Sequence, residues 1–463
     1  MDFPPRELKD IYEKYQEWAA WYSGDREQLI EVYTGMAGKF WAKDIEKERR
    51  TMLHMPLAGD IAGVNSDLLF SEKPQVSLEN ETTQKRVDTS LEQMDWYSRL
   101  LEGAESASAL GGTYLKIDYD RDMLGFPVIN VAQADSAIPE FKWGFLQSVT
   151  FYKIISDINE RHTWRLAEKR ENGSITYKLY KGTLYNLGKE MPLEARSETQ
   201  DLEDVNFNTN KLTVVYIPNK KPNRLWRGSD LGQSDLSGVE SLLDALDETY
   251  TSWMRDIRLG RARIVVPENM LKTVDGKRKF DIDKEIYEGL KWDPNSDAKI
   301  TPQQFALRVE EHRQTTRELI EKIVSVCGYS PASFGIGTEG GQAATATEIK
   351  AKESKSFKTR NKKAKYWERG LEYILEVWLE IDKELFNSQT VVEKPNVTIS
   401  DSIKQDPLEK ADSIEKLNRA EAASVKVKVR MLHPDWKDEE IEAEVERIKR
   451  ESGMIVDEPD VRA

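Results

Sequence analysis

One apolar stripe constrains the fold of this chain more than any other feature. Between Ser234 and Arg258, apolar residues recur at alternating spacings of three and four, the heptad pattern of a helix that packs along another helix. They are Leu236, Val239, Leu243, Leu246, Tyr250, Trp253 and Ile257. Such a helix extends about 37 Å at 1.5 Å per residue. A small sheet cannot cover this length, so we expect a second helix beside it.

Helical and strand patterns occupy separate parts of the chain, which predicts an α+β fold. Spacings of three and four predict helices at 6–33, within 52–70 and at about 84–110. From 112 to 217, alternation with period two predicts a mainly antiparallel sheet, with strands at 113–118, 127–131, 148–155, 162–168, 174–180 and 212–217. Asn172-Gly173, between two of these runs, favours the positive φ angles of a type I′ hairpin.

The second half of the chain alternates long helices with a short insert and a glycine-rich loop. The insert at 260–305 contains a predicted strand at 263–266, and a helix at about 307–327 ends at Gly328. After the loop, Thr345 and Glu348 form a capping-box pattern that predicts a helix at 346–386, about 60 Å long if straight. We then expect a strand at about 395–400 and helices at about 408–423 and 438–451.

Composition and charge exclude several classes of protein. The 463 residues include 68 basic and 82 acidic side chains, a net charge of -14, which argues against a surface that grips nucleic acid everywhere. A channel that lets DNA slide would instead benefit from acidic walls. The single cysteine, Cys327, cannot form an intrachain disulfide. Neither a secretion signal nor a membrane-spanning stretch is evident, so we expect no membrane partner.

The loop after Gly328 contains the pattern G-x-G-x-x-G at Gly335–Gly340. A dinucleotide site would require a strand before the first glycine, whereas 310–326 has a helical pattern. Nucleotide binding remains an alternative, and it would be saturable and lost in Gly337→Ala. The other interpretation is a mobile loop that passes close to a partner. Basic residues on several faces of the following helix are expected to be mostly solvated, with one face available to DNA.

The sequence predicts no catalytic or metal site. Asp118-Tyr119-Asp120-Arg121-Asp122 resembles the start of a calcium loop, but position twelve is Ile129 rather than Glu. The four histidines are isolated, and Cys327 has no histidine nearby in sequence to activate it. We therefore expect a non-enzymatic protein without a cofactor.

Several stretches, taken in order, resemble the portal proteins of long-tailed double-stranded DNA phages over nearly the whole chain. The early ones are His54–Leu57, Asp67–Glu72, Leu179–Gly182 and Leu187-Gly188. The most telling ones are Leu242–Tyr250, Ser252–Gly260 and Ala346–Ile349. None of them is a catalytic signature, so the resemblance depends on their joint order.

The resemblance implies a portal fold with an α/β wing, long stem helices, a small α/β clip, a long kinked helix after a tunnel loop, and a helical crown. Its parts would be the wing at 1–233, stem helices at 234–259 and 307–330, the clip at 260–306, the tunnel loop at 331–345, the long helix and return strand at 346–404, and the crown at 405–463. The tunnel-loop residues would be Gly335, Gly337, Thr338, Glu339, Gly340, Gly341 and Gln342. DNA-facing basic residues would be Lys350, Lys352, Lys355 and Lys358.

The function implied by the resemblance is a head-to-tail connector. Copies of the chain would form a ring, a dodecamer, at one capsid vertex of the virion after assembly in the host cytoplasm. Double-stranded DNA would be packaged and ejected through it. Partners would be the terminase large subunit, the major capsid and scaffolding proteins, and a head-completion adaptor. The apolar stripe would pack between subunits. The alternative is a helical capsid-associated scaffold or adaptor that never contacts DNA.

Overall fold

A computed structural model describes most of the chain. The described residues are 2–42, 52–121, 123–156, 161–259, 263–265, 272–274, 277–279, 301–303, 308–336, 346–400, 414–420, 422–433, 436 and 438–451. The chain divides into a large unit, 1–342 with 351–399, and a small unit, 343–350 with 400–463. The large unit mixes helices and sheets, so the predicted α+β class is confirmed.

The amino-terminal helices are shorter than the sequence pattern predicts. Instead of one helix at 6–33, a 3-10 turn at Arg6–Leu8 leads into α1 (Lys9–Ser23) and then α2 (Arg26–Tyr33). The break is at Gly24, whose φ of 67° ends α1, and the Asp25 side chain accepts a hydrogen bond from Glu27 N to begin α2. The spacing of apolar residues continues across the break because α1 and α2 both bury apolar side chains in the same core.

Three further helices precede the sheets. They are α4 (Leu57–Leu69), α5 (Glu81–Gln93) and α6 (Trp96–Leu110). The sequence predicts a single helix at 84–110, but the structure has α5 and α6 there. Asn80 caps α5 by accepting from Thr83 N, and Asp95, at φ 50°, separates α5 from α6. α4 and α6 pack together, with Asn65 Nδ2 donating to the carbonyl of Ala104 at 3.0 Å.

Two antiparallel sheets follow. One has the strand order β10 (Val214–Pro218), β2 (Gly112–Asp118), β3 (Val128–Gln133). The other runs β4 (Ala137–Lys142), β5 (Phe145–Ile154), β6 (Thr163–Glu171), β7 (Ser174–Thr183), β8 (Asn186–Met191), with β9 (Val205–Asn206) beside β7. β6 and β7 pair up to Glu171 and Ser174, so the predicted hairpin at Asn172-Gly173 is confirmed. Its turn is not the predicted type I′, because only Gly173, at φ 70°, has a positive φ. β4, β8 and β9 were not predicted.

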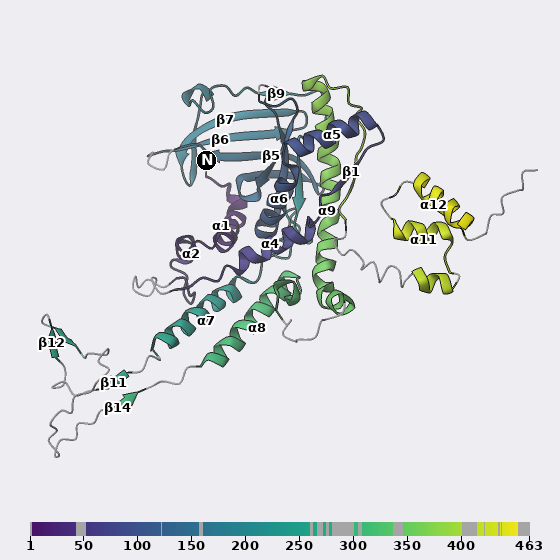
Figure 1. Cartoon of the computed structure of the whole chain (residues 1–463). Helices are drawn as coiled ribbons and strands as arrows, with labels where there is room; N and C mark the ends of the chain where they lie inside the picture. Colours follow the sequence, from purple (N-terminus) through teal and green to yellow (C-terminus); the bar gives the residue numbers. More distant parts are fainter. Residues whose placement is uncertain are drawn as a thin grey trace, which may run out of the picture. The chain divides into compact units, whose positions relative to one another are not determined.

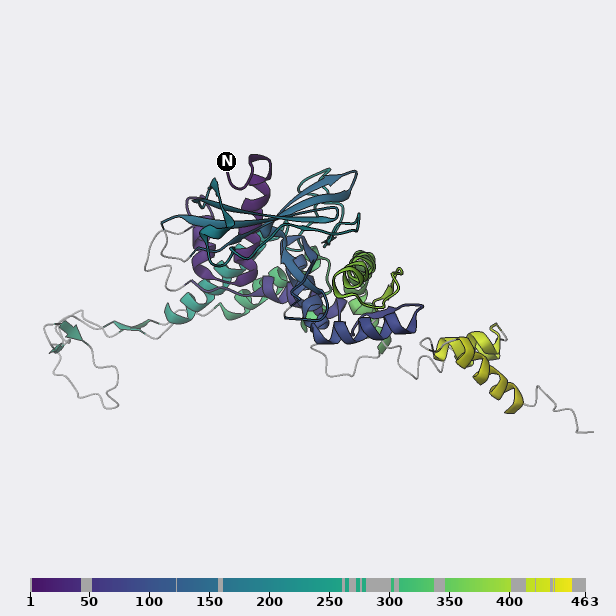
Figure 2. The same ribbon diagram turned by 90° about the horizontal axis from the view of Figure 1, so that it is seen from above.

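The long helix has the bounds that the sequence predicts. α9 spans Ala346–Phe386 and lies beside α5 and α6 (Figure 1). The view from above looks along its axis (Figure 2). Its apolar residues Trp367, Leu371, Ile374, Trp378 and Ile381 are fully buried in a core shared with α6 and the three-stranded sheet. The predicted return strand is β15 (Asn396–Thr398), which pairs antiparallel with β1 (Gln75–Ser77).

α7 (Glu240–Leu259) and α8 (Val309–Cys327) lie side by side in both ribbon views (Figures 1 and 2). Between them, β11 (Arg263–Val265) pairs with β14 (Thr301–Gln303), and β12 (Lys272–Val274) with β13 (Lys277–Lys279). The strand predicted at 263–266 is therefore present. α7 begins six residues later than the predicted Ser234, because the preceding turns include Gly238 at φ 89°.

The small unit contains three helical segments among its described carboxy-terminal residues: 414–419, α11 (Val425–Leu432) and α12 (Asp438–Glu451). α11 and α12 pack through Val429, Ile441 and Val445. The helix predicted at 438–451 is confirmed, whereas α11 was not predicted. Part of the helix predicted at 408–423 lies outside the described residues.

Candidate channel elements and a buried charge network

The predicted stripe on α7 is covered in two different ways. Leu236, Val239, Leu243 and Leu246 are at most 1% exposed and belong to a core made with α1, α4 and the end of α8. A side chain that is buried within one chain offers no surface to a neighbour. The prediction that these four residues form a seam between subunits is therefore wrong: the partner helix that the stripe requires is supplied largely by α8 of the same chain.

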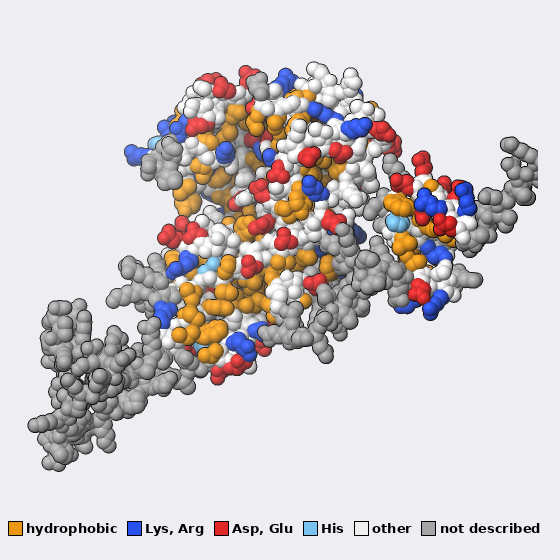
Figure 3. Space-filling view, in the orientation of Figure 1, with side chains coloured by type: hydrophobic (Ala, Val, Ile, Leu, Met, Phe, Trp, Pro, Cys, Tyr) orange, Lys and Arg blue, Asp and Glu red, His pale blue; other side chains and the backbone are white. Residues whose placement is uncertain are grey.

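The remaining part of the stripe keeps exposed surface. Tyr250 and Trp253 are half-buried, and Ile257 is 40% exposed. Val309 and Val326 on α8 are exposed as well. Hydrophobic side chains gather over α7 and α8 in the space-filling view (Figure 3). Three of the seven predicted seam residues are thus available for contact with another molecule.

Polar contacts hold the far ends of α7 and α8 together. Asp256 accepts from Arg308 Nη2 at 2.9 Å and lies 3.0 Å from His312 Nε2. The ring of His312 stacks on Trp253 with 6.1 Å between centroids and 6° between planes. A groove of about 280 Å³ beside this pair is lined by Trp253, Thr316 and Gly335, among others. Trp253 Nε1 and Thr316 Oγ1 are buried there without a hydrogen-bond partner in the described structure.

The base of the glycine-rich loop is tied to α9. Gly328, at φ 104°, ends α8, and its carbonyl accepts from Thr359 Oγ1 at 2.6 Å. A 3-10 turn at Pro331–Phe334 follows, and Ser330, the residue before it, donates its backbone N–H to Ser356 Oγ at 2.8 Å. Gly335 has φ 72° and open space around it, so its conformation rather than crowding favours glycine. The predicted loop residues Gly337, Thr338, Glu339, Gly340, Gly341 and Gln342 lie outside the described residues.

The basic residues at the start of α9 have different environments. Lys355 Nζ donates to the carbonyl and the hydroxyl of Ser325 at 2.6 and 2.7 Å, so it fastens α9 to α8. Lys358 is exposed, and the side chains of Lys350 and Lys352 are outside the description. Arg360, two residues after Lys358, is buried and donates to the carbonyl of Leu68.

Lys363 is fully buried at the centre of a network that the sequence analysis missed. Its Nζ lies 2.6 Å from Asp235 Oδ2 and 2.8 Å from both Asn65 Oδ1 and Tyr329 Oη. Asp235 also pairs with Lys220 Nζ at 2.8 Å. The network joins α4, the turn before α7, the end of α8, and α9. It therefore lies where α7, α8 and α9 meet the sheet region.

Burial and charge shift the protonation of this network. Burial lowers the pKa of Lys363 to about 8, against the opposing effect of Asp235. Burial alone would raise the pKa of Asp235, but Lys220 and Lys363 together hold it below its usual value. Burial raises the pKa of the nearby Cys327 thiol to about 12, so this thiol stays protonated and is a poor nucleophile.

A second buried cluster joins two of the stretches on which the family resemblance depends. Asp247 on α7 accepts from Met55 N at 2.8 Å and from Trp41 Nε1 at 3.0 Å, and its Oδ2 lies 2.8 Å from His54 Nδ1. Asp244, one turn earlier, accepts from Phe40 N at 3.0 Å. These contacts fix the start of α7 against the amino-terminal segment, which gives both stretches a structural role.

Other predicted or rejected sites can be placed in the described chain. The first residue of the G-x-G-x-x-G pattern follows a helix and a 3-10 turn, whereas a dinucleotide site requires a strand before it. No group of three or more potential metal ligands occurs among the described residues. Within the same residues, no helix combines the length and the hydrophobicity needed to cross a bilayer. Asp118, from the calcium-like pattern, is instead paired with Arg170 and Lys116.

Comparison with known proteins identifies a matching family and solved structures of similar fold. Residues 5–458 match the family described as "Phage portal protein, SPP1 Gp6-like". Among solved structures, a chain from the neck of an empty gene transfer agent (GTA) particle is similar with a TM-score of 0.51 and 11% sequence identity, covering 87% of this chain and 96% of that one. A chain from the virion of the native particle aligns with a TM-score of 0.48 and 11% identity, covering 89% and 98%. No curated protein matches the sequence.

Proposed function

Because the chain belongs to the family of SPP1 Gp6-like phage portal proteins, we propose that it is the subunit of a ring through which double-stranded DNA enters and leaves a capsid. The family match over nearly the whole sequence is the observation that carries this proposal. In this role the ring occupies one capsid vertex of the virion. It is a conduit and a docking platform for the terminase motor, the capsid and scaffolding proteins, and a head-completion adaptor, and it hydrolyses nothing itself.

The parts of the ring subunit follow the helices and sheets. Residues 1–233 would form the wing, α7 and α8 the stem, 260–306 the clip, 331–345 the tunnel loop, and 405–463 the crown. The residual apolar surface at Tyr250, Trp253 and Ile257 supports contact between stems, because a ring needs a surface that faces a neighbouring copy. The net charge of -14 per copy supports a bore to which DNA does not adhere.

The mass of the purified full-length chain tests the ring. We expect particles of about twelve copies by native mass measurement, with a central hole wide enough for duplex DNA in negative-stain images. A stable monomer at micromolar concentration would contradict the proposal. A closed assembly without such a hole would favour a scaffold or adaptor that never contacts DNA.

Ile257→Asp tests the stem contact separately from folding. Since Ile257 is partly exposed in the single chain, the substitution should leave the subunit folded, with a melting temperature close to that of the unchanged protein. Between two stems the same aspartate would be a buried, unpaired charge, so rings should be lost in favour of monomers. The measurement is size-exclusion chromatography with light scattering.

Two controls accompany this variant. Ile257→Leu keeps the apolar surface and should assemble normally. Leu243→Asp places the charge in the core of the single chain and should unfold the subunit rather than only dissociate it. Rings of normal mass from Ile257→Asp would show that Ile257 is not buried between subunits.

A further inference from the structure

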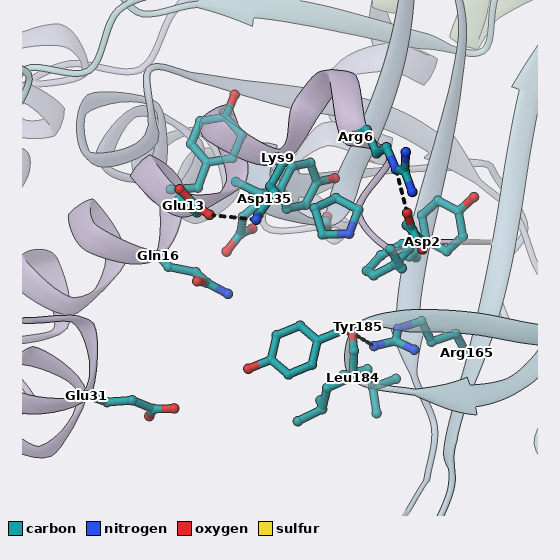
Figure 4. A pocket seen from close by; sticks show the side chains of 17 residues that line it. Asp2, Arg6, Lys9, Glu13, Gln16, Glu31, Asp135, Arg165, Leu184 and Tyr185 are labelled. Atoms are coloured by element: carbon teal, nitrogen blue, oxygen red, sulfur yellow. Dashed lines mark hydrogen bonds and ion pairs between the residues drawn. The ribbon is translucent and has the colours of Figure 1, made fainter. Parts of the chain in front are cut away.

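A large groove opens between the amino-terminal segment and the six-stranded sheet. Its volume is about 1050 Å³, and its walls come from Phe3, Tyr12, Tyr152, Ile154 and Tyr185, among others. Figure 4 shows Glu13, Gln16 and Glu31 from α1 and α2 on one side, and Leu184 and Tyr185 of the β7–β8 turn on the other. Tyr185 is 78% exposed, so the groove presents aromatic surface to its surroundings.

The walls of this groove are held in place within the chain. Phe3 N donates to the carbonyl of Tyr185 at 3.0 Å, and Arg165 donates to the carbonyls of Thr183 and Leu184 at 2.6 and 2.7 Å. The Arg165 guanidinium also lies over the Phe3 ring at 4.5 Å. The groove is therefore preformed, and a ligand would not have to order it.

At the opposite end of β5, the β4–β5 hairpin exposes two aromatic side chains. Trp143 is 87% and Phe145 is 69% exposed. Lys142 pairs with Phe145 across a two-residue turn in which both Trp143 and Gly144 have positive φ, 54° and 82°. Positive φ at both residues is what a two-residue type I′ hairpin turn requires. The two exposed aromatic rings, in contrast, bury little of their surface in the single chain, which indicates contact with another molecule.

The tip of this hairpin cannot fill the groove of its own chain. From Phe145 to Ile154, β5 extends about 30 Å at 3.3 Å per residue, and the groove is at the Ile154 end. The two features are thus separated by the length of the strand. In a closed ring each subunit contacts its neighbours through two different surfaces, which must be complementary.

The charges of the two features are complementary too. At the tip, Lys142 Nζ lies 4.7 Å from the Trp143 ring centroid and brings one positive charge. In the groove, Asp2 pairs with Arg6 and Glu13 with Lys9, whereas Glu31 is exposed and has no cationic partner among the described residues. Asp135 is half-buried and its carboxyl accepts backbone hydrogen bonds, and burial raises its pKa, so Glu31 is the carboxylate that a lysine could reach. A lysine beside two aromatic rings matches an aromatic groove lined by four acidic and three basic side chains.

We propose that the β4–β5 tip of one subunit, Lys142–Phe145, docks in this groove of the next subunit. The contact rests on the proposed ring and defines a wing-to-wing interface in addition to the stem. It joins a tip and a groove on different sides of the subunit, so repetition around the ring closes the assembly without a special subunit.

Cross-linking between introduced cysteines tests the contact. The only native cysteine, Cys327, is buried and protonated, so a maleimide reagent will react with introduced thiols at the surface. In the variant Phe145→Cys with Tyr185→Cys, a short bis-maleimide should link neighbours in succession and give a ladder up to the full ring on a denaturing gel. Phe145→Cys with Met123→Cys is the control, since Met123 is similarly exposed outside the groove, and it should give no ladder.

The outcomes separate this interface from the ring itself. Rings that form but give no ladder, or the same ladder in the control pair, would overturn the tip-and-groove contact and leave the ring proposal intact. As an independent measurement, Trp143→Ala with Phe145→Ala should weaken association by about 30-fold or more, the loss typical of one buried aromatic hot spot. Unchanged association in this variant would also overturn the contact.

Discussion

Asp235→Asn is expected to lower the free energy of unfolding by about 3–5 kcal/mol, which is the usual cost of removing one partner of a buried ion pair. The substitution preserves shape but removes the carboxylate that Lys363 and Lys220 share. Lys363 is fully buried and would keep only the neutral partners Asn65 and Tyr329. Chemical denaturation of the purified protein, compared at equal concentration and in the same assembly state, measures the effect.

The double variant Asp235→Asn with Lys363→Met determines whether the cost comes from an uncompensated charge. Removing both charges leaves neither one buried alone, so the double variant should be more stable than Asp235→Asn by itself. Lys362→Met is the matched control on the same helix: this lysine is exposed, and its loss should change stability by less than about 0.5 kcal/mol. Additive effects in the double variant would show that the two residues are not coupled.

The buried network around Lys363 is one feature that the sequence could not predict. Its members come from residues 65, 220, 235, 329 and 363, and no local pattern brings such distant positions together. One signal was present but was assigned to the surface. Lys363 precedes Trp367 and Leu371 at spacings of four, and so falls on the apolar face of α9. A basic residue on that face must find a buried carboxylate, and here it does.

Local signals succeeded where they did not depend on distant partners. The bounds of α9 were predicted because a capping pattern marks its start and an apolar seam from Trp367 to Leu385 marks its second half. The Asn172-Gly173 hairpin was predicted because Asn-Gly between two alternating runs favours a tight turn, and its glycine has a positive φ. By contrast, α11 contains the alternating run Val425–Val429, which lacks a strong helical signal in sequence, and it is helical while packing against α12.

For the heptad stripe, the helix was predicted correctly, but the surface against which it packs was assigned to the wrong chain. Its spacing identified the helix and the need for another helix beside it, but not which chain supplies that helix. Leu236 to Leu246 face the core of their own subunit, and only the distal residues, from Tyr250 to Ile257, retain exposed surface. An apolar stripe gives the direction of burial, whereas the choice between intramolecular and intermolecular burial depends on the whole fold.

Deletion of Glu339–Gln342 is expected to abolish retention of most packaged DNA while leaving rings intact. If these residues form the tunnel loop, they narrow the bore, and without them DNA under pressure inside the capsid is no longer held. Assembly should survive, because the base of the loop is fastened independently through Ser330 to Ser356 and Thr359 to Gly328. Nuclease-protected DNA per capsid, together with the mass of the ring, measures the two effects separately.

A length-preserving variant distinguishes the reach of the loop from the chemistry of its side chains. Replacing Glu339–Gln342 by Ser-Gly-Ser-Gly keeps the chain length, so retention should be largely restored if the loop acts by occupying the bore. Retention lost equally in both variants would instead assign the effect to Glu339 or Gln342 themselves. Normal packaging and retention by the deleted ring would show that this segment is not the tunnel loop, while the ring and its stem contacts would be unaffected by that result.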